Sequence, residues 1–229
     1  MILEHLSFKQ GKEYLQEIEI NSTKIRFTFQ DWKNFHQNDK FGNPRKYRYE
    51  ILGKSIKLSS TTVRYVKVLQ DILYLYDTDK IRKISEIGVG YGGQARIVLS
   101  KLTNIINYNL IDISEVLLLV KKFLSNFPEN ERALYIDGTQ IGRVIKSDLV
   151  ISNYAFSELV REVQDIYLKN VILCAERGYI TWSTVSYEKF GGYSVEELLK
   201  KIPGAVVMDE KPFTYIGNCL IVWGLKKTL

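Results

Sequence analysis

Cysteine and histidine are scarce in this sequence of 229 residues, which contains two of each. Cys174 and Cys219 each border an apolar segment and belong to no C-x-x-C or Cys/His cluster, so we interpret both as buried core thiols. The two histidines lie in the first 36 residues without a zinc-ligand spacing, which argues against a structural zinc site. We assign no residue as a metal ligand. A divalent metal bound by carboxylates such as Asp39 or Asp148 stays an alternative, although nothing in the sequence indicates one.

Long apolar runs are also missing. The longest clean cluster, "VLLLV" at residues 116–120, is far shorter than the roughly 18 residues of a membrane span. The first residues, "MILEHLSFKQ", place Glu4 and His5 where a signal peptide would be apolar. There is no internal repeat, low-complexity tract or flexible linker. We therefore expect a cytoplasmic globular protein without a membrane span.

An acidic excess is absent, because 32 Lys and Arg face 26 Asp and Glu for a net charge of +6. The basic excess lies entirely in residues 1–83, which hold 16 basic against 10 acidic residues. The densest part, "RKYRYEILGK" at residues 45–54, interleaves cations with aromatic residues, a pattern that suits phosphate or nucleic acid. A solvated face with Tyr47 and Tyr49 packed inward explains it equally well, and we do not expect a nucleic-acid partner.

From residue 83 onward, strand-like and helix-like segments alternate, which is typical of an α/β fold. Expected strands lie at 83–88, 105–112, 132–137, 148–153, 174–185, 204–210 and 218–225, and expected helices at 94–102, 115–126, 155–170 and 195–201, the last capped by Ser194. The connection 211–217 is too short for a crossover helix, so the last two strands should pair antiparallel. The prediction is a Rossmann-like, mostly parallel seven-stranded sheet with an antiparallel C-terminal hairpin.

Upstream of this pattern, residues 59–77 read as a capped amphipathic helix. Residues 1–58 fit no β/α repeat, since 18–30 is strand-like and 38–47 is loop-like. We therefore expect an N-terminal cap or lid over residues 1–58, packed on the face that binds the cofactor, and a cofactor-binding domain over residues 59–229. The cap also provides a candidate surface for a homo-oligomer.

The glycine-rich stretch "ISEIGVGYGGQARIV" at residues 84–98 fits two cofactor templates. Gly88, Gly90 and Gly93 spell the G-x-G-x-x-G of a dinucleotide site, whereas Glu86, Gly88, Gly90 and Gly92 spell E-x-G-x-G-x-G. A dinucleotide brings an anionic pyrophosphate, which a nearby carboxylate would repel. S-adenosylmethionine (SAM) brings an ammonium and a sulfonium, so Glu86 favours SAM.

Further features agree with SAM. After Glu86 only 143 residues remain, enough to complete one sheet but hardly a separate catalytic domain of the dehydrogenase kind. Asp112 ends the next expected strand, where a carboxylate can bind both ribose hydroxyls. That position is acidic in both templates, so an NAD(P)-dependent oxidoreductase stays open as an alternative.

The stretch "SEIGVGYGGQARI" resembles the signature E-I-G-x-G-Y-G-G of the sugar O-methyltransferase family, a branch of the class I SAM-dependent methyltransferases. The similarity extends to "NDKFGNP" at 38–44, "STTVRYVKVL" at 60–69 and "ISNYAFSEL" at 151–159, and so covers roughly residues 38 to 160. Some members carry N-T-R-S-F-x-E-M after the fourth strand, whereas this chain has Ala155 in place of the arginine.

The resemblance implies a cofactor site. The backbone of Gly88, Gly90 and Gly92 would lie against the amino-acid part of SAM, and Asp112 would bind the ribose. The remaining expected contacts are Asp137, Gly138 and Thr139 at the adenine, Arg64 at the SAM carboxylate, Glu86 near its cations, and Asn153 at the end of the fourth strand.

Methyl transfer to a hydroxyl needs the acceptor oxygen aligned behind the methyl group and a base for its proton. Glu158 and His36 are the candidate bases, although Glu158 also suits a helix start and His36 an ordinary surface position. Asp39, Asn43 and Tyr154 are candidates for binding the acceptor, and turn chemistry explains the first two as well.

The prediction is therefore a SAM-dependent O-methyltransferase that acts on a hydroxyl of a sugar or glycan precursor. The basic N-terminal third favours an anionic acceptor such as a nucleotide sugar. Besides the oxidoreductase, a nucleic-acid-modifying methyltransferase and an inactive, binding-only relative are the alternatives.

Overall fold

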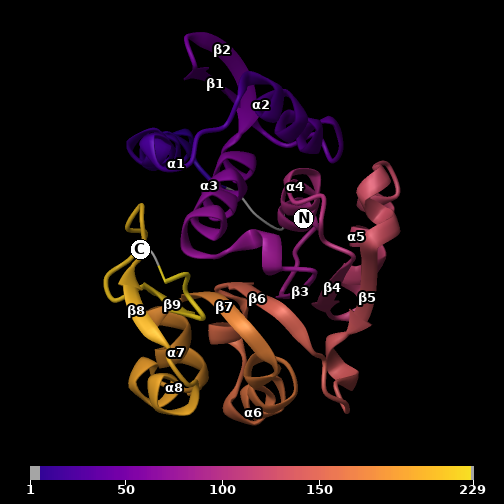
Figure 1. The fold of residues 1–229 in the computed structure, drawn as a ribbon, viewed down its shortest axis with the longest axis vertical. Helices are drawn as coiled ribbons and strands as arrows, with labels where there is room; N and C mark the ends of the chain where they lie inside the picture. Colours follow the sequence, from indigo (N-terminus) through magenta and orange to yellow (C-terminus); the bar gives the residue numbers. More distant parts are fainter. Residues whose placement is uncertain (1–5, 228–229) are drawn as a thin grey trace.

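The computed structural model describes residues 6–227, so the predictions that concern Glu4 and His5 lie outside the described part. Its centre is a seven-stranded sheet in the order β5-β4-β3-β6-β7-β9-β8 (Figure 1). The strands are β3 (Lys83–Ile87), β4 (Asn107–Asp112), β5 (Ala133–Asp137), β6 (Ser147–Asn153), β7 (Ala175–Trp182), β8 (Val206–Asp209) and β9 (Cys219–Trp223). The first five run parallel. β9 lies between β7 and β8 and is antiparallel to both, which confirms the predicted antiparallel hairpin.

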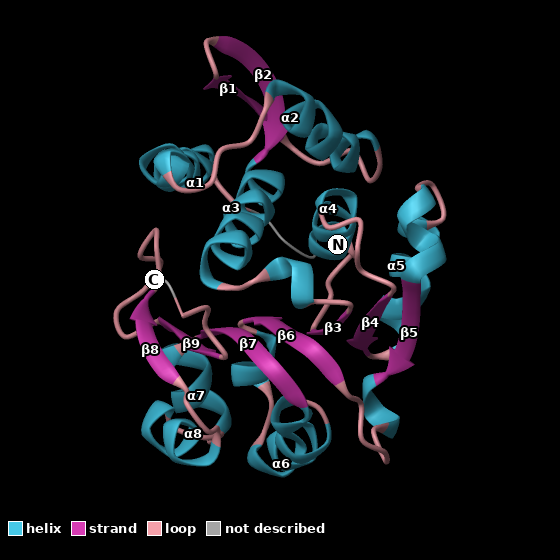
Figure 2. Cartoon of the chain, in the orientation of Figure 1, coloured by secondary structure: helices cyan, strands magenta, loops and turns pink. Residues whose placement is uncertain are grey.

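Helices cover both faces of the sheet (Figure 2). The central strands are buried on both faces, as the runs of apolar residues in them require. In β6, for example, Leu149 and Ile151 pack into the core beneath the N-terminal helices, whereas Val150 joins a second core on the opposite face. The helices α3 (Ser60–Leu75), α4 (Gly93–Lys101) and α5 (Ser114–Leu124) pack on the first core, and α6 (Arg161–Asn170) and α8 (Val195–Lys201) on the second. The short helix α7 (Thr184–Phe190) lies on the same side of the sheet as α6 and α8 (Figure 1).

The N-terminal region adds α1 (Phe8–Ile20), α2 (Phe29–Phe35) and the hairpin of β1 (Lys46–Ile51) with β2 (Lys54–Ser59). In Figure 1 these elements lie beyond α3 and α4, on the side away from the sheet. Their side chains, including Trp32 and Tyr49, belong to the same core as the residues of α3 and α4. The region is therefore packed continuously onto the helices that flank the glycine loop.

Several local predictions were wrong. The strand-like stretch 18–30 contains the end of α1, a 3-10 turn and the start of α2. The segment 155–170 is two elements, the 3-10 helix η6 (Ala155–Glu158) and α6, and the expected strand at 174–185 ends at Trp182, where Ser183 caps α7. Cys219 is buried as expected, and burial raises the pKa of its thiol to about 11, but Cys174 is only half-buried. The caps at Ser59 and Ser194 are confirmed.

Candidate functional site

The glycine loop connects β3 to α4 at the carboxyl edge of the sheet, where open α/β folds bind their ligands. Gly88, Gly90 and Gly92 have φ values of +75°, +53° and +88°, a region that other residues rarely adopt. Gly93 does not have a positive φ and is the first residue of α4. The three glycines of E-x-G-x-G-x-G thus supply the positive φ values of the loop, whereas Gly93 lies in the helix, where an added Cβ would collide with Tyr65 and Tyr91.

Asp112 fixes this loop from the end of the neighbouring strand. Its carboxylate accepts hydrogen bonds from the main-chain N–H groups of Val89 and Ile113, each at 2.8 Å. Burial raises the pKa of the Asp112 carboxyl, while these hydrogen bonds lower it. Each carboxylate oxygen keeps a second lone pair, so the group can still accept hydrogen bonds from a diol.

Glu86 lies below the loop and is 2% exposed. It accepts a hydrogen bond of 2.6 Å from the Tyr108 hydroxyl, and burial beside this carboxylate raises the pKa of Tyr108 well above its ordinary value. The carboxylate is thus fixed on the face of the sheet that packs against α3 and α4, and Glu86 precedes the glycine loop directly in the chain. Its attraction for a bound cation remains a prediction.

Asp137 lies directly opposite Asp112 in the register of β4 and β5. Its carboxylate accepts hydrogen bonds from Thr139, through both N–H and hydroxyl, and from the Ser114 hydroxyl. These hydrogen bonds lower the pKa of Asp137. The main-chain oxygen of Gly138 accepts from the Tyr167 hydroxyl at 3.1 Å. The turn is therefore ordered at the carboxyl edge, where the adenine contact is predicted.

A cavity opens at the same edge, beyond the end of β6, and its volume is about 20 Å³. Three of the predicted site residues line it: Arg64, Asn153 and Tyr154. The sequence analysis did not single out the other lining residues, which are Tyr14, Lys67, Val68, Tyr179, Thr181, Glu210, Lys211 and Leu220. Lys67 lies one helical turn after Arg64, so helix periodicity could have predicted that both residues line the same site. Tyr14 and Glu210 come from distant segments.

Tyr154 has an unusual backbone, with φ of +67° and ψ of −33°. Such a conformation is costly for a bulky residue and occurs mainly at functional sites. Its hydroxyl donates to the carboxylate of Glu210, which is 5% exposed, and lies 3.3 Å from the Thr214 hydroxyl. Burial raises the pKa of Tyr154, and the carboxylate beside it adds to the rise. Tyr154 and Glu210 thus form a hydrogen-bonded pair that lines the cavity, with the proton on Tyr154.

A second polar network supports the cavity from α3. Lys67 Nζ forms a 2.6 Å ion pair with Asp71, whose same oxygen accepts the Tyr179 hydroxyl at 2.7 Å. Burial raises the pKa of Tyr179, and the Asp71 charge reinforces this shift. Asp71 therefore fixes the Lys67 ammonium and the Tyr179 hydroxyl, and both residues line the cavity.

The remaining predicted residues lie elsewhere, and the cavity lining includes none of them. Glu158 is exposed on η6, and His36 is half-buried at the start of the 3-10 helix η2 (His36–Lys40). Asp39 is 1% exposed and accepts hydrogen bonds from the Ser59 N–H and from the hydroxyls of Ser59 and Thr62. It thus secures the N-terminus of α3.

The other surface predictions have similarly local surroundings. Asn43 is exposed in a turn with φ of +45°. Asp148 accepts from the N–H groups of Arg82 and Lys83, next to the start of β3. Within residues 6–227 no group of three or more His, Cys, Asp or Glu side chains forms a metal site, and no helix there is long and apolar enough to cross a membrane.

No family model and no curated protein matches this sequence. Solved structures do match it. The structure of PigF with SAH (S-adenosylhomocysteine) aligns with a TM-score of 0.52 at 14% identity, over 91% of this chain and 69% of that one. The mitomycin 7-O-methyltransferase MmcR aligns at 0.50 and 11% identity, over 94% and 67%. NcsB1, an O-methyltransferase from neocarzinostatin biosynthesis in complex with SAH and 1,4-dihydroxy-2-naphthoic acid, aligns at 0.50 and 12%, over 95% and 69%.

These alignments define the class of fold. The seven-stranded sheet, with β9 inserted antiparallel beside β8, is the Rossmann-like fold of class I methyltransferases. At these identities the likeness shows the fold alone.

Proposed function

We propose that this chain is a SAM-dependent O-methyltransferase. The observation that carries the proposal is the contact between the glycine loop and the segment that lines the cavity. A Cβ added at Gly88 would collide with the Cβ of Ala155, which directly follows Tyr154. The loop that suits a cofactor and the cavity that suits an acceptor are therefore adjacent at one edge of the sheet, as group transfer between two bound molecules requires.

The residues present fit SAM. Gly88 and Gly92 have positive φ values and leave no room for a Cβ, which would collide with Ala155 at Gly88 and with Val120 at Gly92, and Asp112 lies beside the loop with hydrogen-bonding capacity left for a ribose. SAM supplies an activated methyl group on a sulfonium. In this proposal the backbone at Gly90 contacts the amino-acid part of SAM. Arg64 binds the SAM carboxylate, and Glu86 compensates the positive charge of the cofactor. Asp137, Gly138, Thr139 and Asn153 complete the cofactor site.

The lining of the cavity includes many residues with polar groups. Of its eleven lining residues only Val68 and Leu220 are purely apolar, and the other nine carry polar or charged atoms. Sugars need such a density of hydrogen-bonding groups, and the tyrosines add faces for stacking. The acceptor we propose is a sugar hydroxyl, and the cations Arg64, Lys67 and Lys211 against Glu210 suit an anionic one such as a nucleotide sugar.

The volume of about 20 Å³ holds a water molecule but not a sugar ring. In this proposal a sugar would bind at the open mouth of the cavity or after a movement of its wall. The segment 211–217, which begins with the lining residue Lys211, is exposed over most of its length and is the wall with least burial. Tyr14 of α1 lies on the same cavity, so the N-terminal region contributes to its closure as a cap.

The proton of the acceptor hydroxyl needs a base during methyl transfer. The Tyr154 and Glu210 pair lines the cavity, whereas the two candidate bases of the sequence, Glu158 and His36, do not. In this proposal the proton of the acceptor hydroxyl would pass to the Tyr154 oxygen while the proton of Tyr154 passes to the Glu210 carboxylate, and bound SAM would supply the methyl group.

The test is a transfer assay with methyl-labelled SAM and a panel of nucleotide sugars, uronic acids and phosphorylated sugars. We expect label in at least one sugar, and a fall in kcat of roughly 100-fold or more for Glu210→Gln. Glu158→Gln is the matched control and should keep kcat near that of the unmodified chain. Full activity of Glu210→Gln, with loss in Glu158→Gln, would reverse the assignment of the base. Labelling of aromatic hydroxyl compounds alone would overturn the sugar acceptor.

A further inference from the structure

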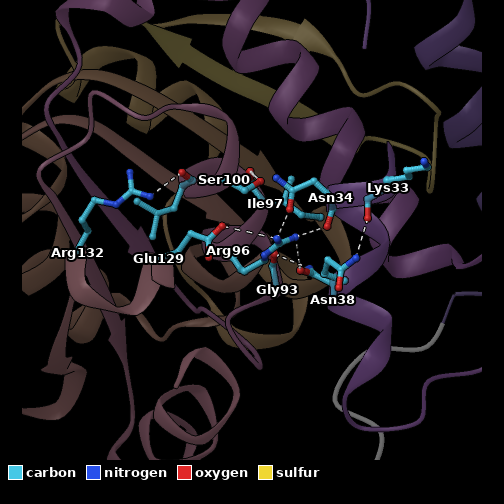
Figure 3. Close-up of polar contacts among 11 residues, drawn as sticks. Lys33, Asn34, Asn38, Gly93, Arg96, Ile97, Ser100, Glu129 and Arg132 are labelled. Atoms are coloured by element: carbon cyan, nitrogen blue, oxygen red, sulfur yellow. Dashed lines mark hydrogen bonds and ion pairs between the residues drawn. The ribbon is translucent and has the colours of Figure 1, made fainter. Parts of the chain in front are cut away.

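A buried arginine joins the glycine-loop helix to the N-terminal region. Arg96 of α4 is 3% exposed, and its guanidinium contacts residues of three other segments (Figure 3). Nη1 donates to the main-chain oxygen of Asn34 on α2 at 2.6 Å, and Nη2 donates to the Asn34 side chain. Nη2 also lies 3.6 Å from Oε1 of Glu129, a buried carboxylate on the 3-10 helix η4 (Pro128–Arg132). The buried cation is thus paired and held on two sides.

Asn38 extends this cluster to the glycine loop. Its side chain is 1% exposed, and its Nδ2 donates to the main-chain oxygen of Gly93 at 2.9 Å. Its Oδ1 accepts from Arg96 Nη1 at 3.4 Å. Gly93 is the first residue of α4 and follows Gly92, the left-handed residue that ends the loop. One amide therefore links the N-terminal region, the first turn of α4 and the buried arginine.

A second link between α2 and α4 provides a contrast. Lys101 Nζ forms a 2.9 Å ion pair with Asp31 of α2. Lys101 is the last residue of α4, about 12 Å along the helix axis from Gly93. Both links join the N-terminal region to α4, but the one made by Asn38, which lies on η2, reaches the first turn of the helix, directly after the glycine loop.

We infer that Asn38 and Arg96 are positioning residues, which clamp the first turn of α4 against the N-terminal region and so hold the glycine loop ready for the cofactor. The inference rests on the proposed SAM site for its ligand readout. The backbone order of the loop is a second readout that needs no ligand. Docking of the N-terminal region and cofactor affinity are then linked, because each favours the same arrangement of this turn.

The test compares Asn38→Ala and Arg96→Lys with the control Lys101→Ala in the full chain. Affinity for SAH is measured by calorimetry, amide hydrogen exchange is followed over residues 88–96, and thermal unfolding is recorded separately. Arg96→Lys keeps a cation beside Glu129 but lacks the planar fork that reaches Asn34 and Asn38 together. We expect both cluster variants to bind SAH roughly tenfold more weakly and to exchange faster in the loop. Lys101→Ala should change neither.

Two results separate the possible failures. A lower melting temperature with unchanged SAH affinity and unchanged loop exchange would overturn the positioning role and leave a purely stabilising one. If the unmodified chain does not bind SAH, the proposed function fails, while the exchange rates of the loop still decide whether the cluster orders it.

Discussion

At the residue scale, the site depends on places where two backbones approach closely. Gly88 and Ala155 lie at the ends of neighbouring parallel strands, and the small side chain of Ala155 occupies the space beside the glycine. Ala155 stands where some sugar O-methyltransferases have arginine, a difference that the sequence analysis noted without a structural reason. An alanine there is compatible with the tight contact at Gly88.

We predict that Gly88→Ala destabilises the protein by about 1–3 kcal/mol and abolishes SAH binding, because alanine is strained at a φ of +75° and its Cβ collides with Ala155. Denaturant unfolding and calorimetry measure the two effects. Gly142→Ala is the matched control, since a Cβ there meets nothing within 4 Å and no positive φ is required. Wild-type affinity in Gly88→Ala would exclude the loop as the cofactor site.

The cofactor side of the site could be predicted from the sequence because it is local. A strand, a glycine turn and a helix follow one another in the chain, and Asp112 ends the next strand. The acceptor side could not be predicted in this way. Tyr154 and Glu210 are 56 residues apart, and only the insertion of β9 beside β7 brings the turn after β8 to the cavity. Tyr14 likewise reaches the cavity only through the packing of α1 on α3.

At the scale of elements, the failed predictions lie where local signals conflicted. Alternating apolar residues in 18–30 indicated a strand, but two capping boxes favour helices on either side: Ser7 with Gln10, and Thr28 with Asp31. The S-x-x-Q and T-x-x-D patterns are visible in the sequence and would have identified both helix starts. The helix α7 was missed because its β-branched start continues the apolar character of β7.

One contact between elements has a predictable pH dependence. Arg161 of α6 forms a two-point ion pair with Glu197 of α8, at 2.6 and 3.0 Å. The Arg161 guanidinium, with the N–H of Ser194, lowers the pKa of Glu197 to about 2 from an ordinary value of 4.5. Because the folded-state pKa is the lower one, this stabilisation is fully present above pH 4.5 and is lost as the pH falls toward 2.

We therefore predict that Glu197→Gln lowers the stability at neutral pH slightly, since both side chains are partly exposed, and flattens the acid-side loss of stability below pH 4.5. Urea unfolding at a series of pH values measures both effects. Glu162→Gln, an exposed carboxylate in the first turn of α6, serves as the control. An identical acid profile for Glu197→Gln and the unmodified chain would show that the pair contributes nothing.

At the scale of the whole molecule, the sheet was predictable from two kinds of signal. The alternation of strands and helices predicted the parallel strands, and the short connection after β8 predicted the antiparallel hairpin at the C-terminal end of the sheet. The place of β9 between β7 and β8 was not predictable, because strand order depends on pairing between distant segments. The same holds for the N-terminal region, whose packing on α3 and α4 depends on buried contacts such as those of Arg96 and Asp39.

The cations that line the cavity do not belong to the densest basic segment of the sequence, residues 45–54. Lys46 donates to the main-chain oxygen of Asp39, and the Arg45 guanidinium lies 5.5 Å from the ring centre of Tyr47. The cations of the cavity instead belong to α3 and to the turn after β8. An anionic acceptor, if bound in the cavity, would therefore meet Arg64 and Lys67 rather than the basic hairpin.

Binding of SAM by the glycine loop is tested by calorimetric titration of the purified chain with SAH and, in parallel, with NADH. We expect saturable binding of SAH, weakened roughly tenfold or more by Asp112→Ala, and no binding of NADH. Binding of NADH without binding of SAH would refute the proposed function and make the loop a dinucleotide site.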